Sequence, residues 1–160
     1  MIRAGDKFPS VTIKQATSEG GSDVDPAALF AGKKVIVFSL PGAFTPTCSA
    51  KHLPGYVKDL PELKKKGIDM VACLSVNDHW VMKYWAEAHD ALGKIVMLAD
   101  GSGLLSKALG IDQDLTKSNM GVRARRGVMV VDDGIVKSIE VEEPGKFEVS
   151  SAEACLRKLA

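Results

Sequence analysis

Short apolar runs alternate with helical stripes along much of the chain. The runs Lys34–Leu40 and Ile68–Val76 are almost unbroken and rich in β-branched residues, which predicts strands buried on both faces of a sheet. A shorter run, Lys94–Leu98, predicts a third strand. Apolar residues at helical spacing predict helices over Asp78–His89 and Ser102–Leu109. This alternation predicts strands that are joined by helical crossovers onto one shared sheet.

The C-terminal part of the chain has a different pattern. Two apolar runs, Gly127–Val131 and Ile135–Ile139, flank the turn sequence Asp132-Asp133-Gly134, which predicts a β-hairpin. The sequence Ser150-Ser151-Ala152-Glu153 has the spacing of a capping box and predicts a last helix that ends near Leu159. Because the hairpin adds antiparallel strands, the predicted fold is α/β with a mixed central sheet flanked by helices. The order of the elements is similar to that of the thioredoxin fold with an insertion.

Other segments are less regular. Loops are predicted for Ser18–Asp23 and for Asp112–Arg123, which is the longest stretch without clear periodicity. Thr47–Lys66 has a helical pattern, but Pro54 and Pro61 interrupt it, which predicts a kinked or two-part helix whose kink lies a turn or more after its start. One helical stripe is expected to pack in the core; its members are Trp80, Val81, Tyr84, Trp85 and Ala88.

Length and composition limit the classes of protein. The 160 residues are 46% hydrophobic, which predicts one domain over residues 1–160 with a sizeable core. The net charge of +1 gives no electrostatic reason to expect nucleic acid or an anionic membrane as a partner. No apolar stretch approaches the roughly 20 residues that span a bilayer, and Met1–Asp6 contains no signal-peptide core. The chain is therefore expected to be soluble and cytoplasmic, with an organelle as the alternative if a leader has been removed.

The three cysteines do not form a disulfide framework, because an odd number leaves at least one thiol free. They favour a reducing compartment or a redox role. Cys73 lies in an apolar strand run, and Cys155 lies on the expected inner face of the last helix, so both are interpreted as packing residues. No Cys-x-x-Cys motif is present, which argues against a disulfide reductase.

Cys48 has a setting that suggests chemistry. It follows the strand run Lys34–Leu40 at the expected start of a helix, where Pro46 suits the first helical position and Thr45 is a good N-cap. Unpaired amides and the helix dipole in the first turn favour a thiolate over a thiol. The alternative is an ordinary buried cysteine.

The surrounding motif resembles that of a known family. The pattern Pro41-x-x-x-Thr45-x-x-Cys48, within PGAFTPTCS, is similar to the peroxidatic motif of peroxiredoxins, and in particular to the type II branch that includes the atypical animal form and the plant type II enzymes. The resemblance extends from about Gly5 to the C-terminus. It is carried further by His52–Tyr56, Ser75–Asp78, Leu98–Gly101 and Gly121–Arg126.

The resemblance implies roles for four residues. Cys48 is expected to attack the peroxide and become a sulfenic acid. The hydroxyl of Thr45 is expected to orient the thiolate and hold a peroxide oxygen, with a purely N-capping role as the alternative. Pro41 is expected to shape the pocket and keep water from the thiolate, with a simple strand terminator as the alternative. Arg126 corresponds to the arginine that stabilises the thiolate and the peroxide oxygens.

The residues around Arg126 allow a second interpretation. By alternation Arg126 shares a strand face with Val128, unlike Arg123 and Arg125, which are interpreted as surface or dimer-contact residues. Without the resemblance, an arginine at a strand end is usually solvated or ion-paired. Type II relatives often have a bulky apolar residue after this arginine. Here that residue is Gly127, so the packing that holds the arginine is an open question.

His52 is four residues after Cys48, which places both on one side of a helix and is also a metal-pair spacing. No second ligand pair accompanies them in the sequence, so neither a metal nor another cofactor is expected. His52 is expected either to polarise the site or to face solvent.

The predicted function is that of a thiol peroxidase that reduces hydrogen peroxide or small alkyl hydroperoxides. Animal type II members carry a resolving cysteine before the last helix, and Phe147–Ser151 has none. The resemblance therefore implies recycling of Cys48 by an external thiol, either glutathione with glutaredoxin or thioredoxin. It also implies a homodimer formed near the active-site edge. Two alternatives stay open: a redox sensor or relay that passes oxidation from Cys48 to a partner protein, and a non-enzymatic thioredoxin-like binding module.

Overall fold

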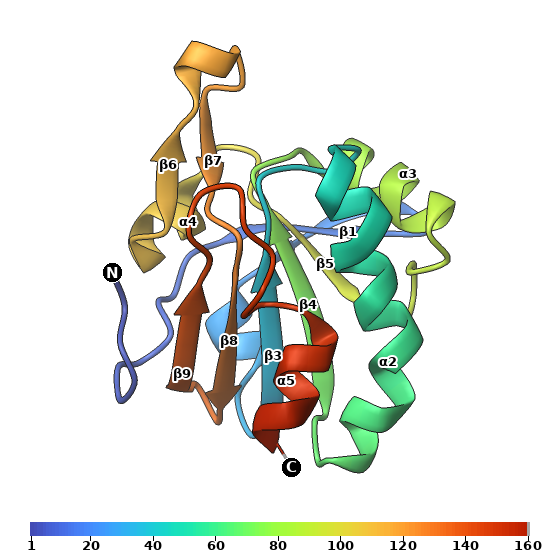
Figure 1. Cartoon of the computed structure of the whole chain (residues 1–160), viewed down its shortest axis with the longest axis vertical. Helices are drawn as coiled ribbons and strands as arrows, with labels where there is room; N and C mark the ends of the chain where they lie inside the picture. Colours follow the sequence, from blue (N-terminus) through green and yellow to red (C-terminus); the bar gives the residue numbers. More distant parts are fainter. Residues whose placement is uncertain (160) are drawn as a thin grey trace.

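The computed structural model describes residues 1–159, and a seven-stranded mixed sheet forms its centre (Figure 1). The spatial order of the strands is β2-β1-β5-β4-β3-β8-β9. The inner strands β3, β4 and β5 are parallel to one another, and the other pairings are antiparallel. The strands of this sheet are β1 (Ile13–Thr17), β2 (Gly20–Val24), β3 (Lys34–Ser39), β4 (Met70–Ser75), β5 (Val96–Ala99), β8 (Gly127–Asp132) and β9 (Ile135–Val141). The predicted α/β fold with a mixed sheet is confirmed.

Helices cover both faces of the sheet. They are α1 (Pro26–Leu29), α2 (Leu53–Lys65), α3 (His79–Ala88), α4 (Leu104–Leu109) and α5 (Ala152–Leu159). Helices α2, α3 and α5 pack on one face, and α1 and α4 pack on the other (Figure 1). Strand β3 supplies both layers, since Ile36 and Phe38 face the first group of helices while Val35 and Val37 face the second. All four of these side chains are fully buried, as the unbroken apolar run predicts.

Two segments predicted to be loops form hairpins instead. Within Ser18–Asp23, a turn leads into β2, which pairs with β1 along its whole length. Within Asp112–Arg123, strands β6 (Asp112–Asp114) and β7 (Val122–Ala124) pair around the short helix η2 (Thr116–Ser118) and project from the body of the protein (Figure 1). Both hairpins expose most of their side chains, so backbone pairing forms them without the apolar alternation that reveals a strand in a sequence.

The helix after β3 has two parts, as predicted, but the irregular part comes earlier than expected. Residues Cys48–His52 form a π-helical segment, η1, in which the N–H of Leu53 donates to the carbonyl of Cys48. Regular α-helix follows through α2, which continues past Pro61. Pro54 has no N–H, and its ring would clash with the carbonyl four residues before it in an α-helix, so widening the preceding turn avoids the clash.

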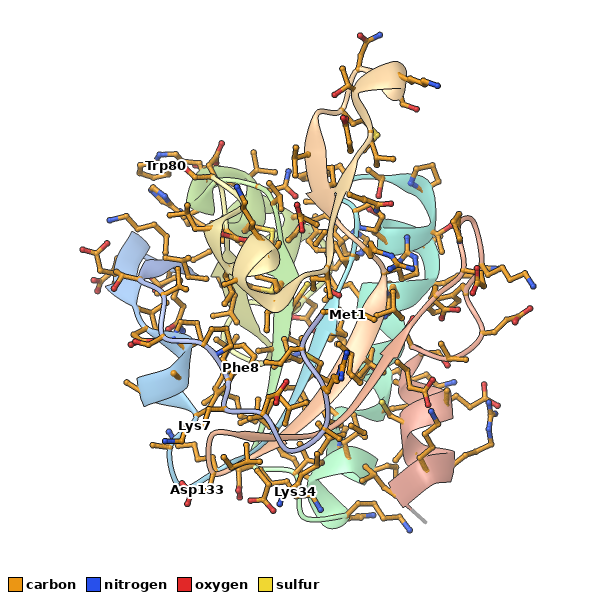
Figure 2. All side chains as sticks on the ribbon, turned by 90° about the vertical axis from the view of Figure 1, so that its left-hand side faces the viewer. Met1, Lys7, Phe8, Lys34, Trp80 and Asp133 are labelled. Atoms are coloured by element: carbon orange, nitrogen blue, oxygen red, sulfur yellow. The ribbon has the colours of Figure 1, made fainter. Side chains whose placement is uncertain are left out.

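Two local predictions are corrected in the helices. The hydroxyl of Ser151 accepts from the N–H of Ala154 and caps α5, whereas the hydroxyl of Ser150 donates to Glu142. In α3, Trp85 is fully buried, but Trp80 and Tyr84 are more than half exposed and do not pack in the core. Figure 2 shows Trp80 at the surface, toward the end of the molecule from which the β6–β7 hairpin projects. Trp80 lies in the first turn of α3, and one side of its ring lies against Gly20 of the edge strand β2, so the rest of the ring is left exposed.

Across residues 1–159, the structure contains no helix that is long and apolar enough to cross a membrane. The prediction that residues 1–160 form one domain stays a prediction.

Candidate active site

The loop that follows β3 is tied to the neighbouring strand β4. The N–H of Ala43 donates to Asn77 Oδ1 over 2.9 Å, and the same oxygen accepts from Ser75 Oγ at the end of β4 over 2.6 Å. Phe44 adopts a left-handed backbone conformation with φ of 63°, which turns the chain back toward the helix and leaves its side chain exposed. The segment that carries Cys48 is therefore positioned by the carboxyl ends of two parallel strands.

Arg123 holds this loop from the side. Its Nη1 donates to the carbonyl of Pro41 over 3.2 Å, and its Nε donates to the carbonyl of Met120 over 2.9 Å. A Cβ atom at Gly42 would lie only 2.6 Å from the same Nη1, so a larger residue here would displace the guanidinium of Arg123. The side chain of Arg123 is half-buried against the loop and is not simply solvated, while the prediction that it contacts a dimer partner stays a prediction.

The hydroxyl of Thr45 is hydrogen-bonded within the turn that precedes the helix. Thr45 Oγ1 donates to the carbonyl of Gly42 over 2.6 Å, and it makes no capping bond with the amides of the first turn. The backbone carbonyl of Thr45 accepts the first helical bond, from the N–H of Ser49 over 3.0 Å. The N–H groups of Thr47 and Cys48 precede that bond, so they belong to the first-turn amides that have no carbonyl partner within the helix.

Arg126 and Cys48 are in direct contact. Arg126 Nη2 donates to Cys48 Sγ over 3.0 Å, and Cys48 is fully buried. Val128, two residues further along, packs in the same cluster as Cys48, which agrees with the strand alternation predicted for Arg126. Arg126 thus places a positive charge against a buried sulfur, where burial reduces the screening of electrostatic attraction.

His52 supports the arginine from the other side. Arg126 Nη1 lies 2.8 Å from His52 Nδ1, and His52 Nε2 lies 3.0 Å from the carbonyl oxygen of Ser150. Because a guanidinium can only donate, Nδ1 is the acceptor and the ring proton is on Nε2. Burial, together with the positive charge of Arg126, lowers the pKa of His52 to about 3. His52 is thus a neutral, buried residue, and the alternative that it faces solvent is wrong.

The packing around Arg126 answers the question raised by Gly127. A Cβ atom at Gly127 would lie 2.7 Å from the carbonyl oxygen of Glu140 on β9, so a larger residue does not fit here without a shift of the strand. The aromatic ring of Phe147 lies over the guanidinium instead, with its centroid 5.8 Å from Arg126 Cζ. The same ring packs edge-on against His52, at 5.0 Å between centroids. Arg126 is therefore held by contacts from a distant loop.

The other cysteines are buried thiols, as predicted. The structure contains no disulfide among residues 1–159, and both Cys73 and Cys155 are buried. Burial raises the pKa of each thiol, and a contact with the Tyr56 hydroxyl opposes this rise at Cys155. Both therefore have less thiolate character than an exposed cysteine.

Two further features lie close to Cys48 and Arg126 in the chain or in space. Trp85 Nε1 donates to Ser49 Oγ over 3.0 Å, so the predicted approach of Trp85 to the active-site side is confirmed. A hollow of about 140 Å³ opens beside Arg126. Its lining consists of Pro41, Thr47, Gln113, Arg125, Arg126 and residues 142–146. Within the part of the chain that the structure describes, no group of three His, Cys, Asp or Glu side chains is placed to hold a metal ion.

The structure brings two of the four predicted site residues, Cys48 and Arg126, into direct contact, and it places the other two in the segment that leads from β3 to the helix. Cys48 contacts Arg126, and Thr45 shapes the turn that precedes the helix. Pro41 lines the hollow and supplies a carbonyl to Arg123. The sequence did not reveal that His52 lies between Arg126 and Ser150, because that contact joins residues 98 positions apart.

Comparisons with known proteins agree with this geometry. Residues 3–156 match the family model described as Redoxin. The chain is 48% identical to "Peroxiredoxin-2B" of Arabidopsis thaliana, over 99% of this chain and 98% of the relative. It is 46% identical to "Peroxiredoxin-2E-2, chloroplastic" of Oryza sativa subsp. japonica, over 99% of this chain and 72% of the relative. A crystal structure of reduced Prx3 from Vibrio vulnificus in complex with hydrogen peroxide superposes with a TM-score of 0.95 and 48% identity, with the whole of both chains covered.

Proposed function

Since the chain belongs to the redoxin family and is a type II peroxiredoxin, and therefore a thiol peroxidase, we propose that Cys48 is the residue that attacks the peroxide. The contact of 3.0 Å between Arg126 Nη2 and Cys48 Sγ at the start of a helix carries this proposal. At this position a nucleophilic sulfur lies beside a fixed positive charge and the backbone N–H donors of a helix start. The substrate is a hydroperoxide. Hydrogen peroxide is proposed as one substrate, supported by the relative that was crystallised with it.

The reaction begins at the sulfur. The Cys48 thiolate attacks one peroxide oxygen, an S–O bond forms, and the O–O bond breaks. The attacked oxygen stays on the sulfur with its proton as the sulfenic acid of Cys48, and the departing oxygen takes a proton from solvent water and leaves as water or an alcohol. Arg126 and the free N–H groups of Thr47 and Cys48 stabilise the charge that develops on the two oxygens. The chain needs no metal or organic cofactor for this step.

Thr45 and Pro41 are proposed to act through the shape of the site. The Thr45 hydroxyl donates its hydrogen bond to the Gly42 carbonyl. Its oxygen can therefore still accept a hydrogen bond from the peroxide. Pro41 lines the hollow beside Arg126 and restricts the access of water to the thiolate. Both roles depend on the tight turn between the end of β3 and Thr45.

An external thiol is proposed to restore Cys48. It condenses with the sulfenic acid to form a mixed disulfide and water, and a second thiol then releases reduced Cys48. Phe147–Ser151 contains no cysteine, and Cys73 and Cys155 are both buried with raised pKa values. We propose glutathione with glutaredoxin, or thioredoxin, as the reductant.

We also propose that the chain forms a homodimer at the edge of the sheet that carries Cys48. Large exposed apolar side chains follow the carboxyl ends of the three parallel strands: Phe44 after β3, Trp80 after β4 and Leu104 after β5, each more than half exposed. Such ends meet at one edge of a sheet, so these residues share the active-site edge (Figure 2 labels Trp80). Sedimentation should give twice the chain mass for the native protein and a lower mass for Leu104→Glu. A wild-type protein that sediments as a single chain would exclude the dimer.

The proposed compartment is the cytoplasm, which keeps free thiols reduced. Two relatives carry the word chloroplastic in their names, so a plastid is the alternative. Fractionation of the source cells, with detection of the native chain, distinguishes the two.

Peroxide consumption with different thiol donors tests the proposed cycle. The reduced protein is mixed with excess hydrogen peroxide and no thiol, glutathione alone, glutathione with glutaredoxin, or thioredoxin with its reductase. Sustained turnover is expected with at least one of the last two mixtures and a single turnover without thiol. A single turnover with every donor, together with trapped mixed disulfides between Cys48 and one partner protein, would favour the redox relay instead.

A further inference from the structure

Glu142 is a buried carboxylate, just beyond the end of β9, whose role the peroxidase chemistry does not explain. Its side chain accepts hydrogen bonds from the N–H groups of Glu148, Val149 and Ser150, at 2.8 to 2.9 Å, and from Ser150 Oγ at 2.7 Å. The residue is only 5% exposed, and it takes part in none of the ion pairs among residues 1–159. The charge is therefore balanced by the loop that follows it in the chain.

That loop contacts Arg126 by three routes. The N–H of Glu142 donates to the backbone carbonyl of Arg126 over 2.8 Å. The ring of Phe147 covers the guanidinium. The carbonyl of Ser150 accepts from His52, whose other ring nitrogen accepts from Arg126 Nη1. The backbone, the face and one edge of the arginine are thus all held by the segment that the Glu142 carboxylate organises.

The Ser150 carbonyl is the point at which these contacts converge. It accepts from His52 Nε2 over 3.0 Å and from the Tyr56 hydroxyl over 2.7 Å, so both of its lone pairs are used. The ring of Tyr56 stacks on Phe38 of β3 at 4.1 Å between centroids. Because the donors come from η1 and α2, a shift of this one carbonyl would disturb the helix that carries Cys48 as well as the histidine.

We propose that Glu142 is a positioning residue for the peroxide reaction: its carboxylate holds the loop 143–150 in the conformation that keeps His52 and Arg126 aligned on Cys48. The inference rests on the proposed roles of Cys48 and Arg126. A carboxylate suits the task because its two oxygens provide acceptor sites for all four donors and it carries no donor of its own. A glutamine in its place has one acceptor oxygen and would point an amide N–H toward the donors of the loop.

The test compares Glu142→Gln with Glu153→Gln, which removes an exposed carboxylate on α5 that pairs with Arg157 at the surface and serves as the matched control. The rate constant for oxidation of Cys48 by hydrogen peroxide is measured by rapid mixing, at a temperature where each variant is fully folded. Loss of a group that orients a functional side chain costs about 10- to 100-fold in metal sites, and a loss of about tenfold is expected for Glu142→Gln. The control is expected to react like wild type.

Two measurements separate positioning from a general loss of stability. The pH midpoint of the thiolate absorbance of the reduced protein should move upward in Glu142→Gln, because a misaligned Arg126 stabilises the thiolate less. In a double-mutant cycle with His52→Asn, the two losses should be much less than additive, since Glu142 acts through His52. Ser150→Ala removes one of the four donors and should show a smaller change in the same direction. This variant provides the test if Glu142→Gln does not fold.

A Glu142→Gln protein with the wild-type rate and the wild-type thiolate midpoint would overturn the inference, even if it unfolds more easily. So would fully additive losses with His52→Asn. Arg126→Lys, measured in the same series, identifies a failure of the proposed site itself. If Arg126→Lys is slow while Glu142→Gln is not, only the positioning role of Glu142 is wrong.

Discussion

Replacement of Arg126 by lysine keeps the positive charge but removes the geometry that the active site uses. One guanidinium reaches two partners at once, His52 Nδ1 at 2.8 Å and Cys48 Sγ at 3.0 Å. An ammonium group is a point charge and can occupy only one of these positions. Arg126→Lys should therefore lose either the contact with the sulfur or the contact with the histidine.

The size of the effect follows from these two contacts. Removing one preorganised donor from a developing negative charge typically costs about 2.7–4 kcal/mol in the transition state. At about 1.36 kcal/mol for each factor of ten, the rate constant with peroxide should fall roughly 100- to 1,000-fold. If the ammonium stays on the sulfur, His52 Nδ1 becomes a buried acceptor without a donor, and the free energy of unfolding should fall by about 1–3 kcal/mol.

Rapid mixing of the reduced protein with hydrogen peroxide measures this rate constant. Tryptophan fluorescence is a suitable signal, because Trp85 donates to Ser49, the residue next to Cys48. Arg125→Lys is the matched control, since the guanidinium of Arg125 makes no hydrogen bond with residues 1–159, and it should react like wild type. The assignment of the arginine is refuted if Arg126→Lys reacts at the wild-type rate while Arg123→Lys or Arg125→Lys is slow.

Three further outcomes are expected. Thr45→Val should react far more slowly than Thr45→Ser, because only the valine loses the hydroxyl that holds the Gly42 carbonyl; equal peroxide rates for the two would reduce Thr45 to a packing residue. The folded pKa of His52, about 3, lies below its unfolded value of 6.5, so the unfolded chain binds more protons between these values and stability falls as the pH is lowered. Denaturant unfolding should show a loss of about 2 kcal/mol by pH 5 from this residue, and the profile of His52→Gln should be flatter by this amount; an equally steep profile in His52→Gln would contradict the assignment. The double variant Cys73→Ser, Cys155→Ser should keep thiol-supported turnover, and a stall after one turnover would reveal an internal resolving cysteine.

The sheet could be predicted because the sequences of its inner strands are continuous apolar runs. An apolar run such as Lys34–Leu40 is buried on both faces, so its composition alone indicates a strand. The strand β2 could not be found in this way, since its central residues Gly21–Asp23 are exposed and only backbone pairing with β1 makes them extended. The π-helical start of the helix was missed for a similar reason. Its cause, Pro54, was recognised, but the turn that adapts to it precedes the proline.

The residues of the candidate site that belong to a local sequence motif could be predicted. Those that depend on contacts between separate segments of the chain could not. Cys48 and Thr45 stand in one short segment, and strand alternation separates Arg126 from its neighbouring arginines. Glu142 gave no signal, because it stands in Glu140–Glu143, which has the composition of an exposed charged strand end. Its burial arises only when the following loop folds back and its amides surround the carboxylate.

The assignment of Cys48 as the attacking residue is tested most directly by the rate at which Cys48→Ser consumes hydrogen peroxide in the presence of the best thiol donor. Serine preserves nearly all of the volume of this buried side chain, and its hydroxyl can still accept from Arg126, so the fold should survive. Consumption should fall to the rate of the donor mixture alone, while Cys73→Ser and Cys155→Ser remain active. Substantial turnover by the folded, purified Cys48→Ser protein would contradict the account.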